Sequence, residues 1–132
     1  MSDENHFSIR TPLGRVRYLG SAHHGTRVFW YQRLTAVANV PLSIAAIVII
    51  FSLLGRNHAA VVQILGSTVV AIAMLLFIVS SVYHMWLGMQ VIVEDYVHDE
   101  TLKLVTLMAN TFFSFAVGLA GVFAILKLSF GL

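Results

Sequence analysis

The sequence predicts an all-α membrane protein with three transmembrane helices, on the basis of its composition and its uncharged segments. Apolar residues make up 58% of the 132 residues and charged residues only 11%, whereas charged residues are about 25% of an ordinary soluble domain. Three segments contain no Asp, Glu, Lys or Arg, namely Leu34–Leu54, Ala59–Val93 and Leu104–Leu126. Because a helix needs about 20 apolar residues to cross a bilayer, each segment is long enough to cross once.

The expected helices cover about residues 30–54, 60–93 and 100–127, so that residues 29–132 form one anchor domain behind an N-terminal arm of residues 1–28. The middle uncharged segment is too long for one crossing, because its length as a helix is about 50 Å. We therefore expect this helix to tilt or to project beyond the hydrocarbon.

Three local features refine these helices. Pro41 should kink the first helix, with Asn39 or Ser43 available to the freed backbone groups, and Asp99 should cap the third. The third helix also carries small residues, which let helices approach closely in lipid. They are Ser114, Ala116, Gly118, Ala120, Gly121 and Ala124. So many small residues on so few helices predict that another subunit covers part of them.

The distribution of basic residues predicts a cytoplasmic N-terminus. Six basic residues would lie on that side: Arg10, Arg15, Arg17, Arg27, Arg33 and Lys103. Only Arg56 and Lys127 would lie on the other side. Three crossings then place the C-terminus in the periplasm and the loop from Glu94 to Lys103 in the cytoplasm. No secretory signal peptide is expected, because the first residues lack an apolar stretch and a cleavage site.

Two function classes are excluded by composition. The chain has no cysteine, so it cannot form a disulfide or ligate an iron–sulfur cluster through thiolates. The net charge of +2 is too small to indicate nucleic-acid binding, since the basic residues mostly form one arm beside a membrane.

His84 is the most informative single residue, because an ionisable side chain at membrane depth is costly and marks a functional candidate. Ser80 and Gly88 lie four residues before and after it, on the same helical stripe. Small residues on both sides of an imidazole would leave a flat slot for a planar macrocycle, with His84 as axial ligand to its iron. The alternative is a packing histidine bonded to a backbone carbonyl of a neighbouring helix.

The C-terminal end of the second helix is unusual in its charge. Glu94 and Asp95 stand where the helix macrodipole disfavours anions by about 0.3–1 kcal/mol each, and local exceptions of this kind often mark functional sites. Tyr96 follows at headgroup level. Its phenol could donate a hydrogen bond to the carbonyl of a quinone, or its ring could be a simple interfacial anchor.

The pattern His84-x3-Gly88-x6-Asp95-Tyr96 resembles the signature of the hydrophobic membrane anchor subunit of succinate dehydrogenase, respiratory complex II. The resemblance is strong over residues 80–98 and weaker over the rest of residues 30–103. It implies that His84 ligates haem b and that Tyr96 hydrogen-bonds ubiquinone. Asp95 would support the quinone site by pairing with a partner arginine and delivering protons, unless it is only solvated.

The same resemblance implies a role for Arg33. The segment Arg33-Leu34-Thr35-Ala36 is similar to the Arg-x-Thr-Ala segment of the family, whose arginine lies near the haem propionates. A guanidinium suits carboxylates through paired donors. The alternative is a basic anchor of the helix end, which needs no haem. Some members carry a histidine six residues earlier, where this chain has Arg27, so that role is not carried over.

The resemblance further implies partner subunits. The other histidines are expected in arms or loops: His6, His23, His24, His58 and His98. The second axial ligand would therefore come from a second cytochrome b anchor subunit. FAD and iron–sulfur clusters would lie only on a flavoprotein subunit and an iron–sulfur subunit.

These expectations define a non-catalytic, multi-pass subunit of the bacterial inner membrane that passes electrons from succinate to ubiquinone only within the complex. Two alternatives stay open. One is the anchor of another quinone-reactive cytochrome b complex, such as fumarate reductase, and the other is a haem-free structural membrane protein.

Overall fold

The structure is a computed structural model that describes residues 23–130. Its elements are α2 (His23–Leu53), α3 (His58–Leu65), α4 (Thr68–Tyr96) and α5 (Glu100–Phe130). The described part contains no strand, and α2, α4 and α5 are long and apolar enough to cross a membrane. The predicted all-α class with three candidate transmembrane helices is therefore confirmed. Most of the predicted arm, including Arg10, Arg15, Arg17 and His6, lies outside the described residues.

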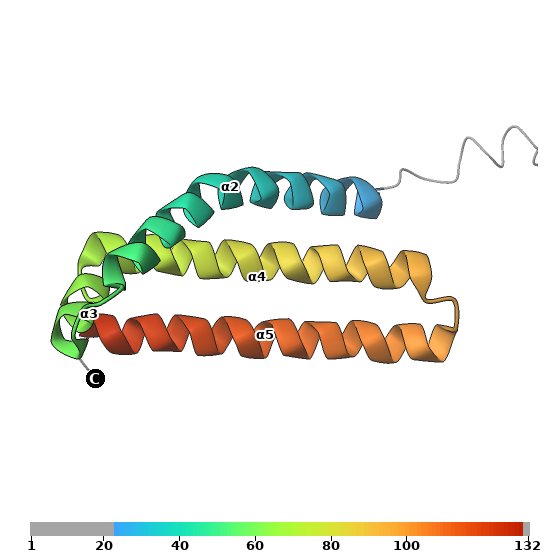
Figure 1. Cartoon of the computed structure of the whole chain (residues 1–132). Coiled ribbons are helices and arrows are strands. Elements are labelled where there is room, and N and C mark those ends of the chain that lie inside the picture. The colour runs from blue at the N-terminus through green and yellow to red at the C-terminus, as the bar shows by residue number, and fades with distance from the viewer. Residues whose placement is uncertain (1–22, 131–132) are drawn as a thin grey trace, which may run out of the picture.

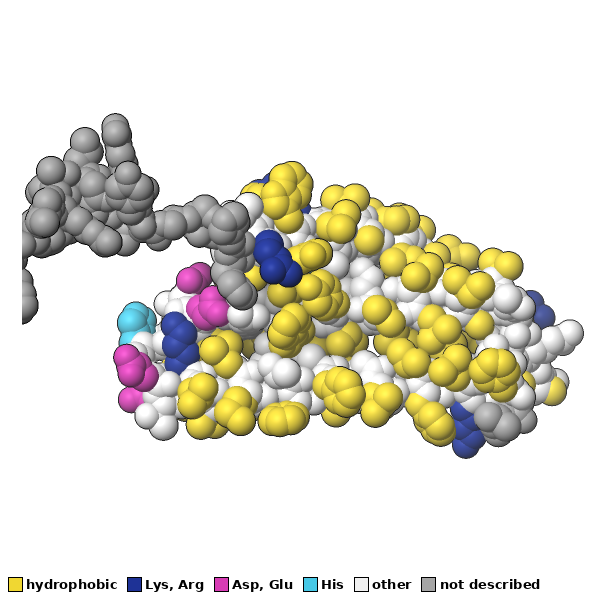
Figure 2. Space-filling view, turned by 180° about the vertical axis from the view of Figure 1, so that it is seen from behind, with side chains coloured by type: hydrophobic (Ala, Val, Ile, Leu, Met, Phe, Trp, Pro, Cys, Tyr) yellow, Lys and Arg dark blue, Asp and Glu magenta, His cyan; other side chains and the backbone are white. Residues whose placement is uncertain are grey.

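The three long helices form one row with α4 in the middle (Figure 1). α4 packs against α2 on one side and against α5 on the other, whereas α2 and α5 share no contacts. Few side chains are buried in such a row; the buried apolar ones are Ala46, Ala71, Leu87, Val93 and Ile125. Figure 2 shows the result on one face, where apolar side chains spread over the middle and most charged side chains gather towards the two ends. An exposed apolar band of this kind suits lipid or partner helices.

The long middle segment does not form the single helix predicted for residues 60–93. It is divided into α3 and α4 at Gly66 and Ser67, where the Ser67 backbone is extended with ψ of 135°. Ser67 Oγ donates to Ile64 O at 2.9 Å, which closes the end of α3. A Cβ on Gly66 would stand 2.8 Å from the Val62 carbonyl oxygen, so this turn requires glycine. The break leaves 29 residues in α4, a length of about 44 Å.

The first helix begins earlier than predicted and is bent. α2 starts at His23 instead of near residue 30, and it bends after its midpoint (Figure 1). Pro41 lies inside it, where the missing N–H and the ring clash with the preceding turn explain a kink. Ser81 Oγ of α4 approaches Asn39 Oδ1 at 3.5 Å, so the polar residue near the kink faces α4.

Small residues let α4 and α5 approach closely. A Cβ on Gly121 would stand 3.0 Å from Ile78 Cγ2, and one on Gly118 would stand 3.3 Å from Val82 Cγ1. Ser114 is buried on the same side of α5. These small residues are therefore used inside the chain, while the other small residues of α5 stay exposed, namely Ala116, Ala120 and Ala124. Only the second group is available for the predicted covering subunit.

Polar bonds reinforce the packing of α4 and α5. The buried Asn110 amide donates to the Trp86 carbonyl at 3.0 Å, and the Trp86 indole N–H donates to Thr111 Oγ1 at 3.2 Å. The Trp86 side chain thus bonds to α5 of its own chain. In an apolar medium these bonds satisfy groups that water cannot reach.

A lysine balances the unusual acidic end of α4. Lys103 Nζ donates to the Glu94 carbonyl at 2.9 Å, which places a cation from α5 at the negative end of the α4 macrodipole. Asp99 Oδ1 accepts from the Leu102 N–H at 2.7 Å, which confirms the predicted cap of α5. The bonds made by Lys103 and Asp99 therefore hold the loop between α4 and α5 in place.

The close approach at Gly121 generates a prediction about stability. Gly121→Leu should lower the free energy of unfolding of the detergent-purified chain by about 1–3 kcal/mol, because the larger side chain overlaps Ile78 and separates the helices. Denaturant-induced loss of helix circular dichroism would measure the change. Ala120→Leu is the matched control, since Ala120 is exposed on the same helix. Equal stability of the two variants would contradict the packing described above.

Candidate functional site

His84 lies on α4 and its ring faces α2. Its Nδ1 is 2.9 Å from Thr35 Oγ1, and its Nε2 is 3.4 Å from Gln32 Nε2. Thr35 Oγ1 in turn lies 2.8 Å from the Tyr31 carbonyl oxygen and 3.1 Å from that of Gln32. Both ring nitrogens therefore meet polar atoms of α2, which is how a histidine can be held among apolar side chains.

The space that Ser80 and Gly88 were predicted to leave beside His84 is occupied by a side chain of α2. A Cβ on Gly88 would stand 3.2 Å from Gln32 Nε2, so the glycine makes the space that the amide reaches. Two buried polar atoms have no hydrogen-bond partner, Gln32 Oε1 and Ser80 Oγ. The slot thus contains unsatisfied polar groups and one flexible side chain. Sequence reasoning missed Gln32 and Thr35 because their contact with His84 depends on how α2 and α4 pack.

A cavity of about 540 Å³ lies between α2 and the C-terminal half of α4. Its polar lining residues are Gln32, Arg33, Gln90 and Glu94. Because Gln32 also contacts His84, the cavity adjoins the histidine site. Glu94 was predicted at the start of the cytoplasmic loop, but it is a residue of α4 that lines this cavity.

The charged residues of this cavity do not neutralise each other. Arg33 lies with its guanidinium carbon 4.4 Å from the centre of the Phe29 ring, and it forms no ion pair with the side chains that the structure describes. The Glu94 carboxylate instead accepts from Gln90 Nε2 at 3.0 Å. The Arg33 guanidinium is exposed and thus available to an anionic group from outside the chain.

Asp95 and Tyr96 lie at the end of α4 and outside the cavity beside Arg33. Both are exposed, and Tyr96 keeps 77% of its surface accessible. In a regular helix, Asp95 falls about three turns after His84 on nearly the same face, whereas Tyr96 lies about 120° further round and about 18 Å from His84 along the axis. The structure therefore brings Arg33 near the His84 site and leaves Tyr96 on a different side of α4.

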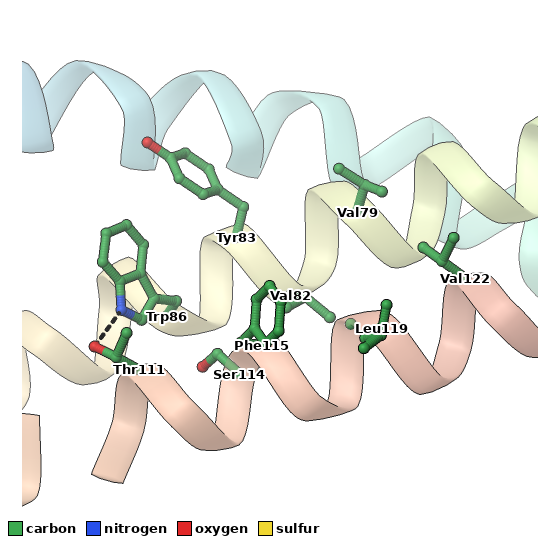
Figure 3. A pocket seen from close by; sticks show the side chains of 10 residues that line it. Val79, Val82, Tyr83, Trp86, Thr111, Ser114, Phe115, Leu119 and Val122 are labelled. Atoms are coloured by element: carbon green, nitrogen blue, oxygen red, sulfur yellow. Dashed lines mark hydrogen bonds between the residues drawn. The ribbon is translucent and has the colours of Figure 1, made fainter. Parts of the chain in front are cut away.

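A second, apolar cavity of about 500 Å³ lies between α4 and α5 (Figure 3). Tyr83 and Trp86 line it, with ring centres 5.7 Å apart, and the Trp86 indole is bonded to Thr111. Its lining is almost entirely apolar and its indole donor is already satisfied. Because its accessible surface is apolar, the candidate site for polar chemistry is the one around His84.

His84 belongs to no cluster of metal-ligating side chains among the residues that the structure describes. Within residues 23–130, no group of three or more His, Cys, Asp or Glu side chains could hold a metal ion. One imidazole can supply a single bond to a metal or metallo-macrocycle, and any further ligand must come from elsewhere.

Comparisons with known proteins agree with this architecture. The chain is 26% identical over 121 residues to the succinate dehydrogenase hydrophobic membrane anchor subunit of Paracoccus denitrificans, covering 92% of this chain and 93% of the relative. It is 29% identical to the subunit of the same name from Rickettsia bellii (strain RML369-C), covering 90% and 95%. No solved structure matches the chain significantly. The profile of the Succinate dehydrogenase/Fumarate reductase transmembrane subunit family matches residues 8–123, and the chain therefore belongs to this family of membrane anchor subunits.

Proposed function

We propose that this chain shares the binding of haem b and ubiquinone with a second cytochrome b anchor subunit, and so helps to pass electrons from succinate to ubiquinone. The observation that carries the proposal is the His84 site, in which one imidazole nitrogen is bonded to Thr35 and the other lies 3.4 Å from the Gln32 amide that fills the space beside Gly88. A histidine that ligates iron is usually held in this way through its second nitrogen.

The residues around His84 suit a haem. Gly88 leaves room next to the imidazole, and the unpartnered Ser80 Oγ and Gln32 Oε1 are buried polar atoms that lack a partner within the chain. The amide of Gln32 would move out of the slot, which costs only a long contact of 3.4 Å to His84. Arg33, with no carboxylate partner among the described side chains, would face the propionates. A haem with both axial positions filled carries electrons and does not bind oxygen.

The row of helices supports the need for partners. α2 and α4 lie side by side in a single layer, so a second anchor subunit could cover the His84 site from one face of this layer and supply the other axial ligand. Under the predicted orientation, the end that carries Glu94, Asp95 and Tyr96 faces the cytoplasm of a bacterial inner membrane. The iron–sulfur and flavoprotein subunits would dock at that end, and succinate would be oxidised on the flavoprotein.

Tyr96 is the group proposed to bind the quinone headgroup. Its phenol is exposed at the last residue of α4, at the depth where a tyrosine meets the headgroup region. A quinone dissolved in the bilayer could reach a donor there. Asp95, which is adjacent and also exposed, would support proton delivery to the reduced quinone.

Two alternatives rest on specific observations. The matching family includes fumarate reductase anchors, whose residues would serve the opposite direction of electron flow. A haem-free structural role is favoured by the fact that both nitrogens of His84 already have neighbours in α2. A redox titration of the haem in the purified complex distinguishes a fumarate reductase anchor from a succinate dehydrogenase anchor. The next experiment tests the haem-free structural role.

His84→Ala should remove or strongly shift the b-type haem signal of the complex purified through this chain, because an axial ligand is lost. A reduced-minus-oxidised optical spectrum of the detergent-solubilised complex would measure this. His58→Ala is the control, since His58 is exposed at the start of α3 and should leave the spectrum unchanged. A spectrum unaffected by His84→Ala would favour the structural role.

Tyr96→Phe should slow succinate-dependent quinone reduction by about tenfold, which corresponds to the loss of one hydrogen bond to the headgroup. Succinate oxidation by a soluble dye should stay at the level of the unchanged complex. Tyr31→Phe serves as the control, since Tyr31 is an exposed tyrosine of α2. An equal fall of both activities in the Tyr96 variant would instead indicate a role in assembly.

A further inference from the structure

The hydrogen bonds around Thr35 define where the protons of the His84 ring lie. Thr35 has one hydroxyl proton and three neighbours, which are the carbonyl oxygens of Tyr31 at 2.8 Å and Gln32 at 3.1 Å, and His84 Nδ1 at 2.9 Å. Carbonyl oxygens only accept. Two oxygens 2.8 Å apart need a proton between them, so the hydroxyl donates to the Tyr31 carbonyl.

This assignment determines the tautomer of His84. With its own proton directed to the helix backbone, Thr35 Oγ1 must accept at the 2.9 Å contact, and the donor is then the Nδ1–H of His84. The Nε2 atom is left with its lone pair. The neighbour of Nε2 is the Gln32 amide nitrogen at 3.4 Å, which is a donor and therefore suits a lone pair. The contacts of Thr35 with the Tyr31 carbonyl and with Nδ1, and that of Nε2 with Gln32, agree with this proton arrangement, whereas the longer contact with the Gln32 carbonyl at 3.1 Å receives no proton of its own.

The reverse arrangement is unfavourable. If Thr35 donated to Nδ1, the hydroxyl oxygen would face the Tyr31 and Gln32 carbonyl oxygens at 2.8 and 3.1 Å with no proton toward either. The Nε2–H of His84 would at the same time point at the Gln32 amide nitrogen, which is also a donor. The arrangement would thus create several repulsive contacts at the border of an apolar layer.

We infer that Thr35 is a positioning residue for His84: its hydroxyl accepts from Nδ1–H and so presents the Nε2 lone pair to the slot beside Gly88. The consequence for haem ligation rests on the proposed function, whereas the tautomer of His84 does not. A hydrogen bond from the second ring nitrogen fixes the orientation of a ligating imidazole and raises its basicity. Thr35 would thus stabilise the ferric state and lower the haem midpoint potential.

The test compares Thr35→Val with Thr35→Ser in the purified complex. Valine keeps the branched shape and removes the acceptor, so the midpoint potential should rise. Carbon monoxide should also bind the reduced haem about tenfold faster, because outer-shell bonds of this kind contribute at least about tenfold to metal binding. Serine retains the hydroxyl and should restore both values. Thr106→Val is the matched control, since Thr106 Oγ1 makes the same bond to its helix, to Leu102 O at 2.7 Å, without contacting His84.

The outcomes separate this inference from the proposed function. A Thr35→Val complex with unchanged potential and carbon monoxide binding would overturn the inference, and so would equal changes in the valine and serine variants. The proposed function fails separately, if His84→Ala leaves the spectrum as it was.

A second measurement applies if the valine variant does not assemble. Nitrogen-15 NMR of histidine-labelled full chain in detergent should show Nδ1 protonated and Nε2 unprotonated for His84. The opposite pattern would overturn the inference without reference to haem.

Discussion

A polar side chain in the middle of a membrane-spanning helix must find its hydrogen-bond partners inside the protein, and this requirement organises the structure around α4. On the α2 side, His84 meets it through Thr35 and Gln32. On the α5 side, Asn110 bonds the Trp86 carbonyl. The two contacts of α4 differ, because the α5 contact is close and glycine-lined and its polar groups are bonded, whereas the α2 contact contains two unsatisfied polar atoms.

Under the proposed function, that difference would favour the α2 side of α4 over the α5 side as the place of a cofactor. Between α4 and α5, glycines bring the helices together, the Trp86 indole donor is satisfied, and the cavity offers an almost entirely apolar surface. Between α2 and α4, the displaced side chain would be Gln32, which is long and flexible and has a carbonyl oxygen without a partner. Moving it costs little, and its unpaired oxygen would gain access to other donors.

The sequence predicted the number of long helices, the cap at Asp99 and the small residues beside His84, because each depends on residues close together in the chain. It did not predict the break at Gly66, since a glycine and a serine within an apolar run are compatible with a continuous helix. It also missed Thr35 and Gln32, whose role depends on the register between α2 and α4. The predicted roles of Arg33, Asp95 and Tyr96 stay predictions, but the structure separates Arg33 from the other two.

Because His84 and Tyr96 lie on different sides of α4, one helix could serve two separate sites. His84 faces α2, while Tyr96 lies about 18 Å further along α4 and about 120° round it. Under the proposed function, the haem would occupy the α2 side and the quinone headgroup would approach another side at the helix end. Lys103 holds this end of α4 through its hydrogen bond to the Glu94 carbonyl. The α4–α5 loop would thus fix the position of Tyr96 independently of the contacts that hold His84, so each site could be altered without the other.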